Sequence, residues 1–283
     1  MSLVPRRCWP WQKARCTRQP PKGRGAVQLA ARGAELVLAC RDLGRGERTA
    51  DDIARRTGAK SCVVLRIDTS SQQSIREFAR QYRERYPRLD VLINNAGINR
   101  SQRQTSVDGV ELTFATNVLG YYLLTRELLD LLRASAPARI VNVASTFASD
   151  LDLADLQFER RAYVGRRAYS QSKACDRMLT WALARRLSGT GVTANAMHPG
   201  FVATEIFGKG GGLVSLGASL YSKLRGLRPE EGADTVVWLA ASPEVEGRSG
   251  LFWISRQERR CRFRDEAGEE ALWALCRDMT RPA

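Results

Sequence analysis

Short apolar runs alternate with longer helical patterns along most of this chain, and this alternation limits the folds that it can adopt. The run at 139–145 reads Arg-Ile-Val-Asn-Val-Ala-Ser, which is typical of a strand buried on both faces of a parallel sheet. Further strands are predicted at 35–40, 61–67, 89–93, 191–197 and 250–254. Helices are predicted at 26–32, 46–57, 71–86, 110–132, 168–187 and 269–279, and another begins at 228. The pattern predicts an α/β fold built on a doubly wound parallel sheet.

The length and composition predict one domain that follows a basic leader. A chain of 283 residues with 43% apolar content can bury one large core, and nothing in the pattern indicates a second domain. We assign residues 1–25 to the leader and residues 26–283 to the domain.

More than half of the formal charge of +15 lies in residues 1–34, which include the leader. Residues 1–34 hold eight Arg or Lys and no acid. Pro5, Pro10, Pro20 and Pro21 prevent a long amphipathic helix, so a solvated, disordered tail is expected. The alternatives are peripheral contact with an anionic membrane and non-specific nucleic-acid binding; no specific nucleic-acid partner is expected. No run of about 18 apolar residues is present to span a bilayer, so we expect an intracellular location, cytoplasmic or peripheral to a membrane.

The cysteines and the single histidine exclude several classes of site. The seven cysteines are odd in number, form no Cys-x-x-Cys pair and have only His198 as a possible co-ligand. A zinc site and a disulfide framework are therefore disfavoured, and no metal is expected. A hydrolase with a Ser-His-Asp triad is disfavoured too, because His198 precedes a Pro-Gly turn and no Gly-x-Ser-x-Gly motif accompanies it.

The candidate catalytic residues are Tyr169 and Lys173, with Ser145 upstream. Tyr169 and Lys173 are four residues apart in a predicted helix, so their side chains leave the same helical face. An ammonium group held close to a phenol lowers its pKa, which would make the tyrosine a usable general acid or base. Such a pair alone is more often an ordinary surface pair. The position of Ser145 favours a catalytic pair instead, because this residue ends a predicted parallel strand and ligands of open α/β sheets bind at such strand ends.

The ordered set of motifs resembles the short-chain dehydrogenase/reductase superfamily, and within it the retinol dehydrogenase group. The matching residues are Asn94-Asn95-Ala96-Gly97, Asn117, Ser145, Tyr169 with Lys173, and His198-Pro199-Gly200 leading to Thr204. They run in the family's order and spacing from about residue 26 to near the C-terminus. The resemblance implies a single Rossmann-like domain with Asn117, Ser145, Tyr169 and Lys173 as catalytic residues.

The resemblance also implies which residues bind the cofactor. Tyr169 and Lys173 would meet its nicotinamide end, Asp68 its adenine, and Asn117 a water of the proton relay. The competing interpretation is that Asn117 is an ordinary buried amide whose hydrogen bonds are satisfied within the fold. The further residues implied are Asn94, Ala96, Gly97, Pro199, Gly200, Val202 and Thr204.

The chain departs from the family where the phosphate-binding turn is expected. Family members carry a strand and Thr-Gly-x-x-x-Gly-x-Gly before the first helix, whereas this chain has Gln-Pro-Pro-Lys-Gly-Arg-Gly at 19–25. The first strand and the glycine-rich turn are therefore predicted to be missing. In the strand order 3-2-1-4-5-6 that strand lies in the middle of the sheet, so its loss leaves two neighbours without ladder partners.

Arg41 follows the predicted strand at 35–40, where an acidic residue would bind the ribose 2′-hydroxyl of NAD. A guanidinium there suits the 2′-phosphate of NADP, so NADP is the expected cofactor. An ordinary surface arginine is the alternative, since the neighbouring Asp42 weakens the signal.

These observations predict an NADP-dependent oxidoreductase acting on an apolar alcohol, aldehyde or ketone, retinoid-like by resemblance. A glycine-rich apolar stretch at 207–227 looks like a mobile lid, which favours a lipophilic substrate. The apolar stripe of the predicted helix 110–132 belongs to the core or to a homodimer face. The alternative function is a catalytically silent variant that retains part of the fold and binds cofactor poorly.

Overall fold

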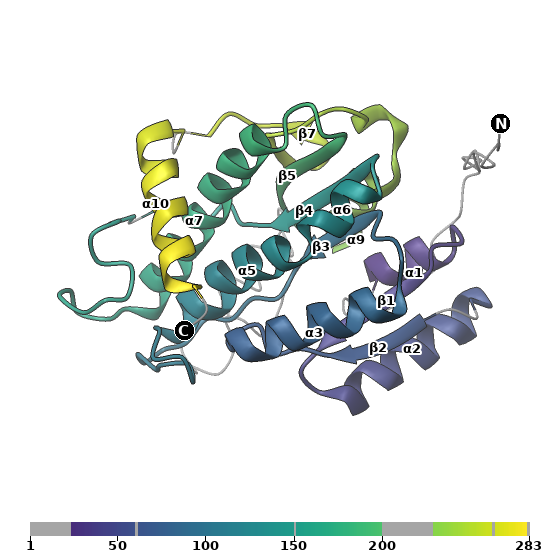
Figure 1. Cartoon of the computed structure of the whole chain (residues 1–283), viewed down its shortest axis with the longest axis horizontal. Coiled ribbons are helices and arrows are strands. Elements are labelled where there is room, and N and C mark those ends of the chain that lie inside the picture. The colour runs from purple at the N-terminus through teal and green to yellow at the C-terminus, as the bar shows by residue number, and fades with distance from the viewer. Residues whose placement is uncertain (1–23, 60–61, 150, 200–228, 262–263, 282–283) are drawn as a thin grey trace.

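The structure is a computed structural model that describes residues 24–59, 62–149, 151–199, 229–261 and 264–281. Its sheet strands lie between helices, with α3 and α5 in front of the sheet and α9 behind it in the view of Figure 1. The strands are β1 (Leu36–Cys40), β2 (Cys62–Arg66), β3 (Val91–Asn94), β4 (Ala138–Val143), β5 (Val192–His198), β6 (Phe252–Ile254) and β7 (Gln257–Glu258). The α/β class and the doubly wound parallel arrangement are confirmed.

The helices match the predicted positions to within a few residues, except between 110 and 134. They are α1 (Arg24–Ala30), α2 (Leu43–Thr57), α3 (Gln72–Arg85), α4 (Leu112–Phe114), the π-helix η1 (Ala115–Leu119), α5 (Gly120–Glu127), α6 (Leu129–Ala134), α7 (Gly165–Arg186), α9 (Pro229–Ala241), the 3-10 helix η3 (Pro243–Val245) and α10 (Glu266–Met279). The single long helix predicted at 110–132 was wrong, because a π-helical turn and a break at Leu128 divide it.

The described strands form two separate ladders. Strand β1 pairs in parallel with β2, while β3, β4, β5 and β6 form a second parallel ladder to which β7 adds an antiparallel edge. Among the described residues no strand lies between β1 and β3, which is the place of the missing central strand. The predicted leader, 1–25, lies outside the described residues except for 24 and 25, so its boundary remains a prediction.

A shared core joins the two ladders through α3. Leu65 of β2 and Phe78 of α3 belong to the same buried cluster as Leu92 of β3 and Ile140 of β4. Ser71 caps α3, as its side chain accepts a hydrogen bond from the Ser74 amide at 3.3 Å. Side-chain burial thus holds β1 and β2 against the rest of the sheet without a continuous ladder.

The apolar stripe between 110 and 132 is part of the core. Val118, Leu124 and Leu132 are buried within the chain. Helix α10 lies across α7 and beside α5 in Figure 1, and its Trp273 ring meets Tyr122 edge-on with centroids 4.9 Å apart. The predicted homodimer is therefore not needed to cover this stripe.

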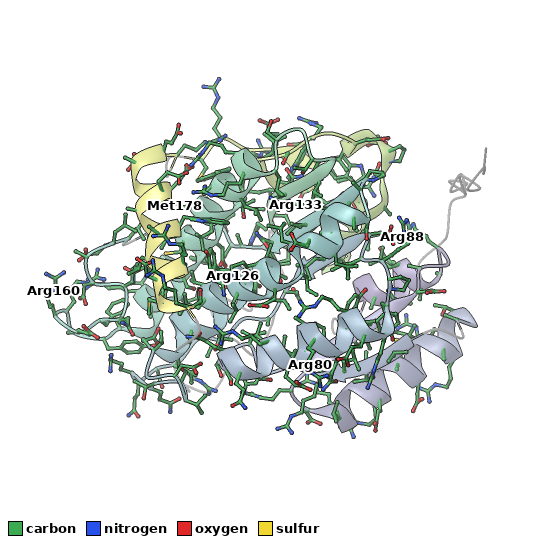
Figure 2. The ribbon with its side chains drawn as sticks, viewed as in Figure 1. Arg80, Arg88, Arg126, Arg133, Arg160 and Met178 are labelled. Atoms are coloured by element: carbon green, nitrogen blue, oxygen red, sulfur yellow. The ribbon has the colours of Figure 1, made fainter. Side chains whose placement is uncertain are left out.

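Arginine side chains extend from several elements of the face shown in Figure 2, among them Arg80 of α3, Arg133 of α6 and Arg160 in the loop before α7. Many pair with acids on the same helix; Arg80, for example, contacts Glu77 at 2.7 Å and Glu84 at 2.5 Å. Exposed pairs of this kind stabilise a fold by less than about 1 kcal/mol each. Within the described residues, no helix has the length and apolar character needed to cross a membrane.

Gly120 allows α5 to approach the loop after β2. A Cβ at this position would lie 2.5 Å from the carbonyl oxygen of Thr69, a backbone atom that moves only with its loop. We expect Gly120→Ala to lower the free energy of unfolding by about 1 to 3 kcal/mol through overpacking. Gly44→Ala is the control, because its Cβ would meet nothing closer than 3.6 Å. Urea unfolding of both variants measures the difference, and equal stabilities would contradict the close approach.

Candidate active site

Ser145 lies just beyond the carboxyl end of β4. Its side chain is buried, and its Oγ accepts a hydrogen bond from the Phe147 amide at 3.1 Å. Its carbonyl oxygen accepts from the Arg177 guanidinium of α7. The strand end and the helix thus hold Ser145 in place, and its hydroxyl hydrogen is available for a substrate oxygen.

Helix α7 carries Tyr169 and Lys173 along the side of β4. The ammonium nitrogen of Lys173 lies 5.9 Å from the centroid of the Tyr169 ring, and both side chains are buried. The same Nζ donates a hydrogen bond to the Val143 carbonyl at 3.0 Å, which ties the lysine to the strand that ends before Ser145. The structure therefore brings the three predicted residues to one strand end.

Lys173 has a further partner that sequence reasoning missed. Its Nζ donates to Asp176 Oδ2 at 2.8 Å, and both side chains are almost fully buried. Burial raises the pKa of Asp176 to about 6, against the lowering effect of the ammonium. Burial acts to lower the pKa of Lys173, but Asp176, Tyr121 and Tyr169 together raise it above its usual value. The available signal was the position of Asp176, three residues after Lys173 on one helix.

Asn117 ties the loop after β3 to α7. Its Oδ1 accepts from the Ile98 amide at 2.9 Å, and its Nδ2 donates to the Ile98 carbonyl at 3.0 Å and to Ser172 Oγ at 2.9 Å. Ser172 in turn donates to the Tyr169 carbonyl at 2.8 Å. The π-helical turn η1 is centred on Asn117, and such turns are frequent at functional sites.

Gly97 lies next to the Lys173 ammonium. A Cβ at this position would lie 3.8 Å from both Asn117 Oδ1 and Lys173 Nζ. Ala96 is exposed on the same loop. A nicotinamide ribose fits this place chemically, since it offers hydroxyls to an ammonium and requires small residues at its side.

Asn94 points away from that loop into a buried polar network. Its Nδ2 donates to Asn142 Oδ1 at 2.8 Å and to Thr125 Oγ1 at 3.0 Å. Asn142 continues the network to Thr180 of α7 at 2.9 Å. Asn94 thus links β3, β4 and α5 through side chains, and this bonding fixes the strand end from which the loop departs.

Arg41 and Asp68 meet at the carboxyl ends of β1 and β2. Arg41 Nη1 lies 4.0 Å from Asp68 Oδ2, and the Arg41 side chain is 66% exposed. Asp68 also accepts from the Ser70 amide and hydroxyl at 2.9 and 2.6 Å. Asp42 caps α2 by accepting from the Arg45 amide at 2.9 Å. Asp42, the acid that weakened the sequence signal for NADP at Arg41, is therefore engaged in capping α2.

His198 and Pro199 mark the end of β5. His198 Nδ1 accepts from the Thr146 amide at 3.3 Å, next to Ser145. Burial and the nearby Arg177 charge lower its pKa to about 4, so the imidazole is neutral at neutral pH. Pro199 is half-buried. Gly200, Val202 and Thr204, and the stretch predicted to be a lid, lie outside the described residues.

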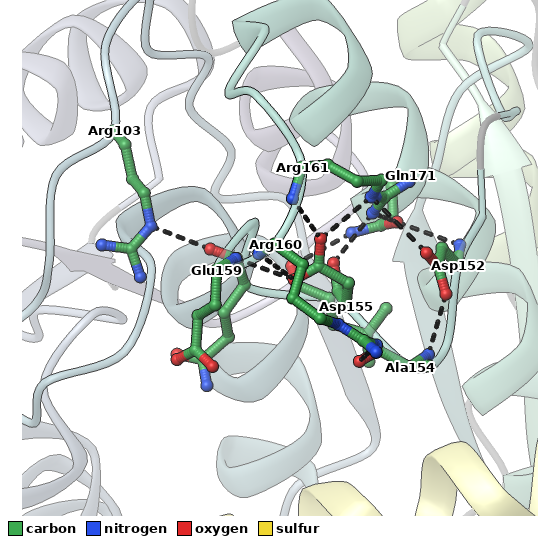
Figure 3. A network of polar contacts seen from close by, with 10 residues as sticks. Arg103, Asp152, Ala154, Asp155, Glu159, Arg160, Arg161 and Gln171 are labelled. Carbon is green, nitrogen blue, oxygen red and sulfur yellow. Dashed lines mark hydrogen bonds and ion pairs between the residues drawn. The ribbon is translucent and has the colours of Figure 1, made fainter.

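The segment between β4 and α7 is irregular where it is described, and its side chains bond to α7. In Figure 3, Arg161 reaches across to Asp155 and Gln171, at 3.0 Å in each case. Arg103 approaches from the loop before α4 and donates to the Gln157 carbonyl at 2.9 Å. This network gives the loop near Ser145 a defined place on the helix that carries Tyr169.

Known proteins resemble this chain in sequence and in structure. The model of the short chain dehydrogenase family matches residues 24–210. Human retinol dehydrogenase 13 is 39% identical over 259 residues, 88% of this chain and 78% of that protein. Human retinol dehydrogenase 14 is 37% identical over 274 residues, 90% of this chain and 81% of that protein.

Solved structures show the same fold. An uncharacterized protein from Mycobacterium paratuberculosis superposes with a TM-score of 0.70 at 31% identity, over 90% of this chain and 87% of that one. A complex of RhlG with NADP from Pseudomonas aeruginosa superposes with a TM-score of 0.63 at 28% identity, over 82% of this chain and 89% of that one.

Proposed function

The chain belongs to the short-chain dehydrogenase/reductase family, in its retinol dehydrogenase-like group, and from this premise we propose that it is an NADP-dependent oxidoreductase of apolar alcohols and carbonyl compounds. The observation that carries the proposal is the meeting of Tyr169, Lys173 and Ser145 at the end of β4. NADP(H), when bound, supplies or accepts the hydride. The chain provides position and proton transfer.

Each catalytic side chain has a separate task. The Ser145 hydroxyl orients the substrate oxygen by a hydrogen bond, and the Tyr169 hydroxyl gives that oxygen a proton in reduction or removes one in oxidation. The Lys173 ammonium stabilises the phenolate that remains after proton donation. Asn117 keeps the loop with Gly97 against the same helix through its bonds to Ile98 and Ser172.

The cofactor is assigned to two groups of residues. Tyr169 and Lys173, with Ala96, Gly97, Pro199, Gly200, Val202 and Thr204, would hold the nicotinamide end. Asp68 would meet the adenine, and Asn94 would support the loop between the two ends. Arg41 would pair with the 2′-phosphate, because its guanidinium is exposed at the end of β1 and its neighbour Asp42 is engaged at the start of α2.

The proposed substrate class rests on the relatives, whose names give retinol as their substrate. We propose a lipophilic alcohol or aldehyde of that kind for this chain. Peripheral membrane contact through the basic leader and a homodimer remain predictions. A catalytically silent variant remains the second candidate, favoured by the lack of a described strand between β1 and β3.

Fluorescence titration with NADPH separates the two candidates, followed by turnover of an apolar aldehyde. Micromolar binding with turnover supports the oxidoreductase. Binding too weak to saturate at millimolar NADPH, together with no turnover, would reject it in favour of the silent variant.

The choice of NADP over NAD is tested at Arg41. We expect Arg41→Ala to weaken NADPH binding at least about tenfold and to leave NADH binding nearly unchanged, because a charge-assisted hydrogen bond to the 2′-phosphate is lost. Arg55→Ala is the matched control, since this arginine lies in the last turn of α2 and pairs with Asp52 at 3.1 Å. Equal losses for both nucleotides would contradict the assignment.

A further inference from the structure

The Lys173 ammonium is shared between the catalytic strand end and a carboxylate on its own helix. Two of its three hydrogen atoms are used by the Val143 carbonyl at 3.0 Å and by Asp176 at 2.8 Å. The side chains of Lys173 and Asp176 are 4% and 0% exposed. The carboxylate is therefore a fixed, poorly screened neighbour of the catalytic cation.

The second carboxylate oxygen of Asp176 takes no part in the hydrogen bond to Lys173. Its Oδ1 is buried and has no hydrogen-bond partner among the described residues. Asp176 lines a pocket between α5, α7 and α10, on the side of α7 that faces α10. Tyr121 and Arg126 line the same pocket.

The Asp176 carboxylate opposes the electrostatic effect that the Lys173 ammonium has on the Tyr169 phenol. A positive charge near a phenol favours the phenolate, and a negative charge 2.8 Å from the cation cancels part of that effect. The carboxylate also restrains the ammonium, because a hydrogen bond between buried charges is costly to break. Both effects limit how strongly Lys173 activates Tyr169.

We propose that Asp176 is a positioning residue that restrains and partly neutralises the Lys173 ammonium, and that it thereby sets the pH dependence of the proposed reaction. This inference rests on the proposed oxidoreductase function and deepens it. Asp176 touches neither the substrate nor the cofactor; it acts through Lys173.

The groups around the pair allow this role. Tyr121 faces it from α5, with its ring centroid 5.2 Å from Lys173 Nζ, and Cys276 faces it from α10. Cys175 and Arg177 flank Asp176 on α7, and Arg126 lies at the pocket. Burial raises the pKa of Cys276 and Cys175, so both thiols stay neutral near pH 7. The Arg177 charge acts on Asp176 from the same helix, and Asp176→Asn leaves that arginine in place.

The test is the pH profile of kcat/KM for oxidation of an apolar alcohol with NADP⁺, in wild type and Asp176→Asn. Oxidation requires Tyr169 to accept a proton, so activity rises with pH. Removing the carboxylate strengthens the net positive charge beside the phenol, and we expect the midpoint of the rise to move to lower pH by about one unit. At a pH below the wild-type midpoint, the variant would be up to about tenfold faster.

Glu269→Gln is the matched control. Glu269 is a buried carboxylate of α10 that pairs with Arg185 at the contact with α7, away from Lys173. Its loss should lower the melting temperature without moving the pH midpoint. Asp176→Ser is measured alongside, so that a folding defect of one Asp176 variant does not decide the result.

The outcomes separate this inference from the function on which it rests. An active wild type whose midpoint is unchanged in both folded Asp176 variants would overturn the role of Asp176 alone. Equal shifts in the Glu269 variant would overturn it as well, because any lost carboxylate would then suffice. A wild type without turnover at any pH would overturn the proposed function and this inference with it.

Discussion

Replacing Tyr169 by phenylalanine is expected to lower kcat by about 10²- to 10⁴-fold, the usual contribution of a positioned general acid or base. The substitution removes only the hydroxyl from a buried side chain on α7 and leaves the ring in place, so the fold should be kept and the affinity for NADPH should change little. Initial rates with an apolar aldehyde, a thermal melt and an NADPH titration measure the three quantities.

Tyr82→Phe is the control for that experiment. Tyr82 is a buried tyrosine of α3, and its hydroxyl donates to the Arg88 carbonyl at 3.2 Å, away from β4. Its loss should cost about 1 kcal/mol of stability and leave kcat unchanged. Normal turnover by Tyr169→Phe would falsify the assignment of the acid/base, whatever the control does.

Lys173→Met is expected to lower the free energy of unfolding by about 3 to 5 kcal/mol near neutral pH. The side chain of Asp176 is fully buried, and the lysine supplies its ion pair at 2.8 Å, so the substitution leaves an uncompensated charge. Turnover should be lost in the same variant. Urea unfolding measures the stability, and a loss below about 1 kcal/mol would contradict the buried ion pair.

The pH dependence of that loss has a definite sign. Burial already raises the pKa of Asp176 to about 6 in the wild type, above its usual 3.8, and loss of the ammonium raises it further. A raised folded pKa means that the native state keeps its proton longer than the unfolded chain, so stability falls as pH rises from about 4 through the folded pKa. Lys173→Met should therefore cost less at pH 5 than at pH 8.

The double variant Lys173→Met with Asp176→Leu supplies the complementary result. Replacing both partners of a buried pair by apolar residues is often neutral. We expect the double variant to recover most of the stability lost in Lys173→Met without any turnover, which separates the structural cost from the catalytic one.

The sequence predicted the strands well, because each is a short apolar run bounded by polar or turn residues. The carboxyl ends of those runs located Ser145 and the loop at Gly97 correctly. Asn117 was found among apolar neighbours, where a buried amide requires partners. Its bonds to Ile98 and Ser172 show how that requirement is met.

The features that the sequence did not predict depend on contacts between distant elements. The π-helical turn at Asn117 inserts one residue into a helical pattern, which periodicity over a long window averages out. The antiparallel strand β7 is two residues long and has no pattern of its own. Asp176 was passed over because an acid three residues after a lysine usually forms an exposed pair; only packing by α5 and α10 buries it.

The interrupted ladder between β1 and β3 has a consequence for cooperativity. Amide-to-carbonyl bonds do not connect the Arg41 side of the described sheet to the Tyr169 side, so the packing of α3, and of α1 against α2 and α9, must transmit any loss of structure between them. Weakening those contacts would let β1, α2 and β2 open as a unit of their own, and the proposed place for adenosine would then be lost while the proposed proton-transfer residues kept their arrangement.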